Sequence, residues 1–170
     1  MSNTNHVAII GGGASGMIAA ITAARHGCAV TIYERQDRVG KKLLATGNGR
    51  CNLTNVNCSI ANFHGEDPGF VETALSRYPV AATIKFFNDL GVITIVEPDG
   101  KVFPRSGQAS TILDVLRFEL EQRNIAVEIN TPISAIKPTK KGFALLSGSK
   151  TFSADHVVVS AGSLAMPQLG

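Results

Sequence analysis

The sequence of 170 residues contains no tryptophan, and aromatic residues make up only 6% of it. A chain this poor in aromatic side chains is a poor platform for stacking the bases of single-stranded nucleic acid. Charged residues are also sparse, at 17%, whereas 44% of the residues are hydrophobic, which excludes a disordered chain. The net charge is only +3. We therefore expect a globular protein that does not bind nucleic acid.

Cysteine is scarce as well: the chain has Cys28, Cys51 and Cys58, and no pair has CxxC spacing. This odd, sparse set argues against a disulfide framework and against a zinc site. A redox role for Cys51 is disfavoured because no partner cysteine lies at a redox spacing. The four histidines are scattered: His6, His26, His64 and His156. We therefore predict no metal site.

Between Val7 and Ala24 the sequence has no charged residue, a run long enough to raise the question of a membrane segment. Three features argue against one: glycines interrupt the run, no basic stretch precedes it, and the hydrophobic period changes within it. We therefore expect neither a signal peptide nor a membrane span, and by default a cytoplasmic location.

The uncharged run instead predicts a strand, a turn and a helix. Val7–Ile10 is wholly apolar, which is typical of a strand buried on both faces of a parallel sheet. Residues 14–26 favour a helix that ends at Gly27, and Cys28–Tyr33 favours a second strand. Such a β-α-β unit has a right-handed crossover and parallel strands. A further buried aliphatic strand is expected at His156–Ser160.

The rest of the chain predicts an irregular stretch over residues 36–69, followed by helices, a hairpin and a meander. Helices are expected at 70–90, restarting at Pro79, and at 111–123, with Ser110 as its N-cap. Strands are expected at 92–96, 101–103, 125–129, 133–137, 143–146 and around Phe152. These elements indicate an α/β fold class: a Rossmann-like fold with a parallel sheet and an antiparallel β-meander.

Residues 11–16 read Gly-Gly-Gly-Ala-Ser-Gly, between the first strand and the first helix. In this context Gly11 permits a tight turn, Gly13 lets the backbone approach a pyrophosphate, and Gly16 allows the helix to pack closely on the strand. The helix N-terminus offers unpaired N–H groups and a positive dipole to phosphates. The motif therefore predicts a dinucleotide site, with a plain glycine turn as the alternative.

Glu34 ends the second strand, 18 residues after Gly16. A carboxylate at this place can accept hydrogen bonds from a ribose diol, and its charge would repel a 2′-phosphate. The spacing supports dinucleotide binding, but it does not distinguish NAD from FAD.

A second glycine-rich segment, GKKLLATGNGRCNLTN, occupies Gly40–Asn55 and carries three cationic side chains. Such a loop can wrap a ligand with backbone N–H groups and neutralise phosphates. A flexible basic loop is the alternative interpretation.

The glycine motif, Glu34 and the second loop together resemble the BaiN-like, or aminoacetone-oxidase-like, family of bacterial NAD(P)/FAD-dependent oxidoreductases. Two further segments share the resemblance: Glu97–Pro104, which reads EPDGKVFP, and Val157–Gly162, which reads VVVSAG. The second loop is far more specific to the family than the glycine motif, and the resemblance covers essentially the whole chain.

The resemblance implies FAD as the cofactor and assigns its contacts by position. The pyrophosphate would contact the glycine motif, and the adenosine ribose would contact Glu34 and its neighbour. The second loop would line the flavin side, and the backbone at Ile133 would contact the adenine. The turn after the last strand would lie near the pyrophosphate and the ribityl chain. The implied residues are Gly11, Gly13, Ala14, Ser15, Gly16, Glu34, Arg35, Lys41, Lys42, Gly47, Asn48, Gly49, Arg50, Cys51, Asn52, Ile133, Ala161 and Gly162.

The chain departs from the family at Ser163, where a second glycine is usual, and at Met166, where an aromatic residue is common. It also stops at Gly170, whereas the family continues through a substrate-side domain to a C-terminal segment that contacts the flavin. The resemblance thus implies that residues 1–170 are the N-terminal part of an FAD/NAD(P)-binding Rossmann-like domain.

The favoured function is that of a flavin-dependent oxidoreductase acting on a small molecule, with NAD(P)H as a candidate electron donor and no membrane partner. The sequence identifies no catalytic acid or base. Two alternatives stay open: an NAD-binding dehydrogenase domain, which leaves the second loop without a purpose, and a non-catalytic nucleotide-binding fragment. A role on RNA is weakly supported, because no aromatic–basic surface is evident.

Overall fold

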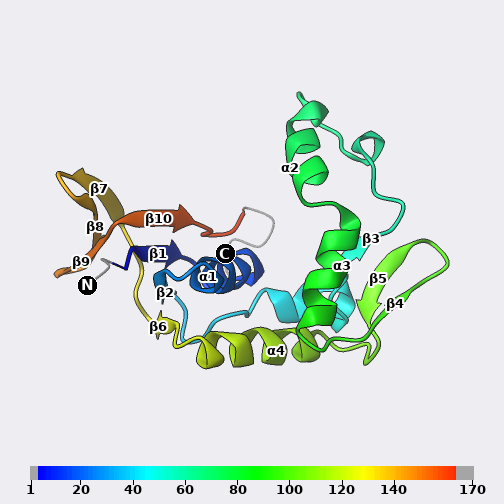
Figure 1. Cartoon of the computed structure of the whole chain (residues 1–170), viewed down its shortest axis with the longest axis horizontal. Helices are drawn as coiled ribbons and strands as arrows, with labels where there is room; N and C mark the ends of the chain where they lie inside the picture. Colours follow the sequence, from blue (N-terminus) through cyan, green and yellow to red (C-terminus); the bar gives the residue numbers. More distant parts are fainter. Residues whose placement is uncertain (1–3, 164–170) are drawn as a thin grey trace. The chain divides into compact units, whose positions relative to one another are not determined.

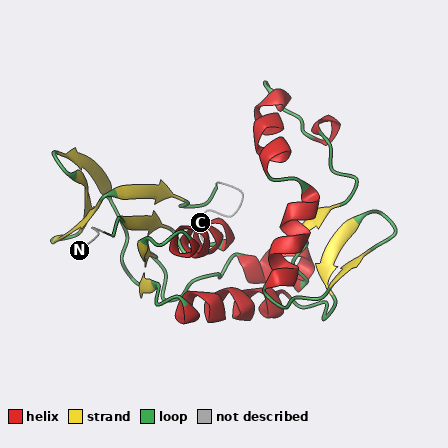
Figure 2. Cartoon of the chain, viewed as in Figure 1, coloured by secondary structure: helices red, strands yellow, loops and turns green. Residues whose placement is uncertain are grey.

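The computed structural model describes residues 4–163, which divide into two compact units. The first unit comprises residues 4–43 and 116–163, and the second comprises residues 44–115. Figure 1 labels the elements of both units, and Figure 2 separates helices from strands.

A four-stranded parallel sheet is the framework of the first unit. Its strand order is β10-β1-β2-β6, and every neighbouring pair is parallel. The strands are β1 (His6–Ile10), β2 (Ala29–Tyr33), β6 (Ala126–Glu128) and β10 (His156–Val159). Helix α1 (Ala14–Arg25) connects β1 to β2, which confirms the predicted β-α-β unit.

The two faces of this sheet are covered by different elements. Helix α1 packs against β1 and β2, with Met17 and Ile21 fully buried. A three-stranded antiparallel meander is formed by β7 (Ala135–Thr139), β8 (Gly142–Ser147) and β9 (Lys150–Ala154), as predicted. Because successive side chains of a strand alternate between faces, the set that packs on the meander is separate from the set that faces α1.

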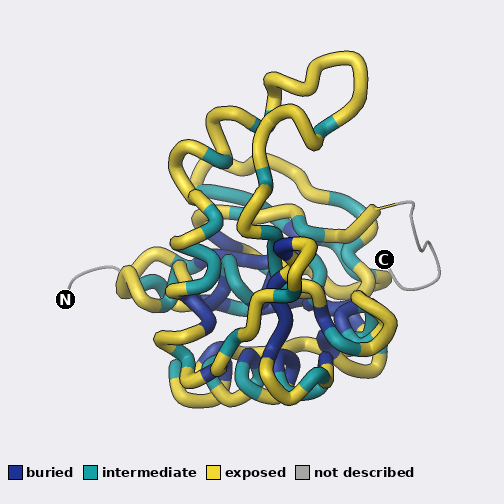
Figure 3. Tube along the Cα trace, turned by 90° about the vertical axis from the view of Figure 1, so that its right-hand side faces the viewer, coloured by how far each residue is buried: buried dark blue, intermediate teal, exposed yellow. Residues whose placement is uncertain are grey.

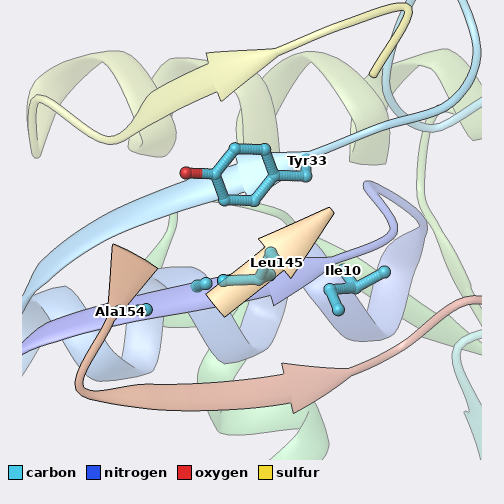
Figure 4. Packing of buried hydrophobic residues seen from close by; sticks show 5 residues of the cluster. Ile10, Tyr33, Leu145 and Ala154 are labelled. Atoms are coloured by element: carbon cyan, nitrogen blue, oxygen red, sulfur yellow. The ribbon is translucent and has the colours of Figure 1, made fainter. Parts of the chain in front are cut away.

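The core between the parallel sheet and the meander is visible in Figure 4. Leu145 of β8 is fully buried among residues of β1, β2 and β9: Ala8, Ile10, Tyr33 and Ala154. The rings of Tyr33 and Phe152 pack with their centroids 4.8 Å apart. This core fixes the end of β2, where the first candidate site residues follow.

The second unit contains a small antiparallel sheet of order β3-β5-β4. Its strands are β3 (Thr54–Asn55), β4 (Thr94–Val96) and β5 (Lys101–Pro104), and its α-helices are α2 (Glu72–Arg77) and α3 (Val80–Asp89). Three 3₁₀ segments occur before α2: η1 (Leu43–Gly49), η2 (Ile60–Asn62) and η3 (Pro68–Val71). Helix α4 (Ala109–Gln122) begins in the second unit and ends in the first.

Burial along the chain is uneven (Figure 3): most of β1 is buried, whereas residues 59–70 are almost entirely exposed. The predicted hairpin around Pro98-Asp99-Gly100 is confirmed, as is the helix that restarts after Pro79. Residues 54–55 lie in the stretch predicted to be irregular, yet they pair with β5.

The strand expected over 125–129 is confirmed in a shorter form, as β6 (Ala126–Glu128). Two other details of the sequence-based prediction are wrong. Helix α4 begins at Ala109, so Ser110 lies inside its first turn, where its hydroxyl donates to Gln108 Oε1 (3.4 Å) instead of capping the helix. Strand β10 is not buried: Val159 is 65% exposed, because β10 is an edge strand of the sheet over the described residues.

No helix within residues 4–163 is long and apolar enough to cross a membrane.

Candidate functional site

The turn between β1 and α1 is closed by backbone contacts at Gly11. This residue has φ +101°, a left-handed conformation that favours glycine, and its N–H donates to the carbonyl of Tyr33 (2.8 Å). A Cβ at Gly11 would collide with the carbonyl oxygen of Ser160, which follows β10. The predicted tight turn is confirmed, and it needs a glycine for space as well as for conformation.

Gly16 lies in the first turn of helix α1 and packs against the β1–α1 connection at Gly11. A Cβ there would collide with the carbonyl oxygen of Gly11 and would come within 2.8 Å of Ser160 Oγ. The Ser160 hydroxyl is itself 3.0 Å from the carbonyl oxygens of both Ile10 and Gly11. Helix, turn and β10 therefore meet with no room for a side chain at Gly11 or Gly16, as the motif predicts for close packing.

Gly13 differs from Gly11 and Gly16 in its surroundings. It is the N-cap of α1 with φ −75°, a value open to any residue, and a Cβ built there meets no atom of the described chain within 4 Å. The first turn of α1 contains no acidic residue. A helix N-terminus with open space beside its N–H groups is a ready-made site for an anion such as a phosphate.

The Glu34 carboxylate fixes this turn from the end of β2. It is buried, with 8% exposure; its Oε2 accepts a hydrogen bond from the Gly12 N–H (2.6 Å), and its Oε1 accepts one from the Gln36 N–H (2.8 Å). A Cβ at Gly12 would collide with the side chain of Val39. A carboxylate has about four acceptor sites, so Glu34 can still accept from another donor.

Sequence reasoning missed this structural role of Glu34. It quoted Gly12 and Ser160 only as parts of longer motifs and gave no role to them or to Val39. The spacing of the motif pointed to Glu34 only as a ribose acceptor. No sequence pattern shows that a side chain bonds to an amide 22 residues away.

The two lysines predicted for the cofactor site have different surroundings. Lys41 Nζ lies 2.6 Å from Asp37 Oδ1 and 3.2 Å from Gln36 Oε1. The hydrogen bond from Lys41 to Asp37 lowers the pKa of the Asp37 carboxyl. Lys42 Nζ lies 3.4 Å from the hydroxyl of Ser163, a neutral partner. Within residues 4–163, Lys42 forms no salt bridge with a carboxylate, whereas Lys41 does.

The remaining predicted residues of the first unit lie at three places. Ala161 is adjacent to the glycine turn, since a Cβ at Gly11 would come within 3.1 Å of its Cα, and Gly162 follows it with φ +94°. Ile133 packs at the border of the core beneath the meander. Arg35 directly follows Glu34 after β2.

The predicted loop residues 47–52 lie in the second unit, where the backbone is unusual. Gly47, Asn48, Gly49 and Cys51 all have positive φ, between 54° and 82°. The backbone at Gly47 and Asn48 therefore interrupts the 3₁₀ segment η1. Left-handed conformations are uncommon outside glycine and persist only where the surroundings hold them. Such backbone turns group N–H donors and are often found where anions bind.

Cys51 is 7% exposed, and burial raises the pKa of its thiol, an effect that a hydrogen bond with Thr46 opposes without reversing it. The thiolate is the reactive form of cysteine, so burial makes this residue less reactive. Within residues 4–163, no group of three or more His, Cys, Asp and Glu side chains is arranged to hold a metal ion.

The strand, glycine turn and helix, followed by an acidic residue after the second strand, define the class: a Rossmann-like nucleotide-binding fold. The HI0933-like protein Rossmann domain family matches residues 5–170, so the chain belongs to this family.

Two relatives extend the comparison. The chain is 41% identical over 168 residues to the 3-dehydro-bile acid delta(4,6)-reductase of Clostridium scindens, covering 98% of this chain and 41% of that protein. It is 29% identical to the ribosomal RNA dihydrouridine synthase of Haemophilus influenzae, covering 100% and 43%. The chain thus spans about two fifths of the length of these relatives. The similarity confirms the resemblance to the BaiN-like family.

Solved structures confirm the fold. THI4 of Thermovibrio ammonificans superposes with a TM-score of 0.62 at 15% identity, over 94% of this chain and 58% of that one. NikD, an amino acid oxidase, superposes with a TM-score of 0.56 at 14% identity, over 96% and 53%.

The geometry predicts that the glycines of the motif differ in their effect on folding. Gly16→Ala places a methyl group against the backbone of Gly11, and we expect it to lower the free energy of unfolding by about 3 kcal/mol, the upper end for overpacking. Gly13→Ala adds a methyl group to open space and costs less than about 1 kcal/mol, mainly through its weaker N-cap. Urea denaturation followed by circular dichroism measures both; equal losses would contradict the assignment.

The raised pKa of Cys51 predicts slow alkylation. At pH 8 this thiol holds less thiolate than an ordinary cysteine, so we expect its reaction with iodoacetamide to be slow and to accelerate as the pH rises. Mass spectrometry of the peptide containing Cys51 gives the rate, with a model cysteine peptide as control. A rate equal to that of the control at pH 8 would contradict the buried placement.

Proposed function

We propose that this chain forms the FAD-binding part of a flavin-dependent oxidoreductase. The observation that carries the proposal is the contrast within the glycine motif. Gly11 and Gly16 are closed by the fold itself, whereas Gly13 faces open space at the N-terminus of α1. Folding alone explains the flanking glycines but not Gly13, which suits the approach of a diphosphate. Membership of the HI0933-like family and the reductase relative support it.

In this proposal the residues of the first unit bind the adenosine diphosphate half of FAD. The N–H groups of Gly13, Ala14 and Ser15 receive the diphosphate, and Glu34 accepts from the ribose while it holds the turn. Lys42 supplies the positive charge, because Lys41 is paired with Asp37. The resemblance places Lys41 and Lys42 on the flavin side, but both belong to the first unit, so we assign them to this half. The residues assigned to this half are Gly11, Gly13, Ala14, Ser15, Gly16, Glu34, Arg35, Lys41, Lys42, Ile133, Ala161 and Gly162.

The loop of the second unit is assigned to the flavin half. Its left-handed residues and its arginine suit the carbonyl oxygens and ring nitrogens of an isoalloxazine, which accept hydrogen bonds. The assigned residues are Gly47, Asn48, Gly49, Arg50, Cys51 and Asn52. We propose further that residues 1–170 form the N-terminal, nucleotide-binding part of the enzyme, consistent with the two fifths of the relatives' length that the chain spans.

When bound, FAD would supply hydride transfer, with NAD(P)H as the proposed source of the electrons. The names of both relatives point to the reduction of a C=C bond that is conjugated to a carbonyl group. In the first relative this bond belongs to a 3-dehydro-delta(4,6) bile acid, and in the second it belongs to the uracil ring of uridine. We propose the same reaction class here, in which the β-carbon gains hydride and the α-carbon gains a proton. The low aromatic content and small net charge favour a small-molecule substrate over RNA.

The test of the proposal is FAD binding by the protein and by Gly13→Val. Valine places its branched side chain in the space assigned to the diphosphate, so we expect loss of measurable binding with a nearly unchanged melting temperature. Thr22→Val, on the exposed part of the same helix, is the matched control and should bind as the wild type does. Quenching of flavin fluorescence gives the dissociation constants. Unchanged binding by Gly13→Val would refute the site, and binding of NAD but not FAD by the wild type would favour a dehydrogenase.

Replacement of the acidic residue tests the ribose contact. Glu34→Ala removes an acceptor and frees the Gly12 amide, and we expect FAD binding to weaken by about 1–3 kcal/mol, the scale for hydrogen bonds to a charged group. Isothermal titration with FAD measures the change, with Glu121→Ala, on the exposed surface of α4, as control. An unchanged dissociation constant would exclude Glu34 from the site.

A further inference from the structure

The Arg50 side chain, in the loop 47–52, is held by two residues of the β4–β5 hairpin. Its guanidinium carbon lies 3.9 Å from the centroid of the Phe103 ring, and its Nη2 lies 2.5 Å from Glu97 Oε1. Phe103 is buried, with 4% exposure, whereas Arg50 and Glu97 remain partly accessible. The guanidinium is therefore fixed on one face by the ring and at one edge by the carboxylate.

The same aromatic ring supports the backbone of the loop. A Cβ at Gly47 would lie 3.1 Å from Phe103 Cε1 and 2.7 Å from the Asn52 nitrogen, so the chain passes closely over the ring. The Arg50 N–H donates to the Gly47 carbonyl (3.1 Å), and the Leu53 N–H donates to the Val102 carbonyl (2.8 Å). Side chain and backbone of the loop thus rest on one strand, β5.

This support is needed because the loop conformation is unfavourable by itself. Asn48 and Cys51 have left-handed backbones with φ of 54° and 60°. Asparagine tolerates this conformation, but a cysteine adopts it only where the surroundings hold it. The Arg50–Glu97 pair joins positions 47 residues apart in sequence, whereas Lys85–Asp89 is a local pair within one helix turn. An ion pair between distant segments constrains a loop more than a local pair does.

The hairpin gives Glu97 a rigid base. Its N–H donates to the Lys101 carbonyl (2.9 Å), and its own carbonyl accepts from the Gly100 N–H (2.8 Å). The carboxylate is thus presented from a turn that is closed by its own backbone hydrogen bonds.

We propose that Glu97 is a positioning residue of the cofactor loop: by holding Arg50 on the face of Phe103, it keeps residues 47–52 in the conformation that receives the flavin half of FAD. The inference deepens the proposed function and rests on it. Glu97 makes no contact with the cofactor in this account and acts only through Arg50.

A double-mutant cycle on FAD affinity tests this. We expect Glu97→Gln and Arg50→Gln each to raise the FAD dissociation constant, Glu97→Gln by about fivefold, as expected for loss of a partly exposed ion pair. The double variant should bind no more weakly than Arg50→Gln alone, because Glu97 has no effect once Arg50 is absent. Asp89→Asn, which breaks the local pair in α3, is the control and should leave FAD affinity unchanged.

The outcomes separate the two proposals. The inference is supported if the wild-type protein binds FAD and the double variant binds it no more weakly than Arg50→Gln does. The melting temperature of the FAD-free Glu97→Gln protein must also fall no further than that of Asp89→Asn. Wild-type affinity in Glu97→Gln, or losses that multiply in the double variant, would overturn the role of Glu97 and leave the FAD proposal intact. A wild-type protein that binds no FAD would overturn both.

Discussion

The contact on which the first unit depends is the approach of one backbone to another at the glycine turn. Gly16 lies against the carbonyl of Gly11, and Gly11 lies against the carbonyl of Ser160, so α1, the turn and the end of β10 are packed without intervening side chains. Such packing leaves little freedom in the direction of α1 relative to β1. The N-terminus of α1, with open space at Gly13, is therefore held in place before any ligand arrives.

The rest of the first unit reinforces that arrangement. The meander packs Leu145 and Phe152 onto the end of β2, and β2 delivers Glu34 to the amide of Gly12. A single buried carboxylate thereby links the second strand to the glycine turn. A group that both shapes the turn and retains acceptor capacity is well suited to link the binding of a ribose to that of a diphosphate.

Much of this could be predicted from the sequence because the signals are local. The apolar run of β1, the glycine turn and the amphipathic helices have short periods, and the roles of Gly11 and Gly16 followed from the motif. Contacts between distant positions could not be predicted in this way: the bond from Gly12 to Glu34 and the pair between Arg50 and Glu97 leave no pattern in one sequence. The exposure of β10 was missed for the same reason, since an aliphatic run does not show whether its strand lies at an edge.

The central claim is that the N-terminus of α1 receives the diphosphate of FAD, and a crystal structure of the protein grown with FAD tests it most directly. We expect diphosphate oxygens within hydrogen-bond distance of the backbone N–H groups at Gly13, Ala14 or Ser15, with the ribose hydroxyls beside Glu34. A structure in which FAD binds elsewhere, while the space at Gly13 is filled by other protein atoms, would contradict the account.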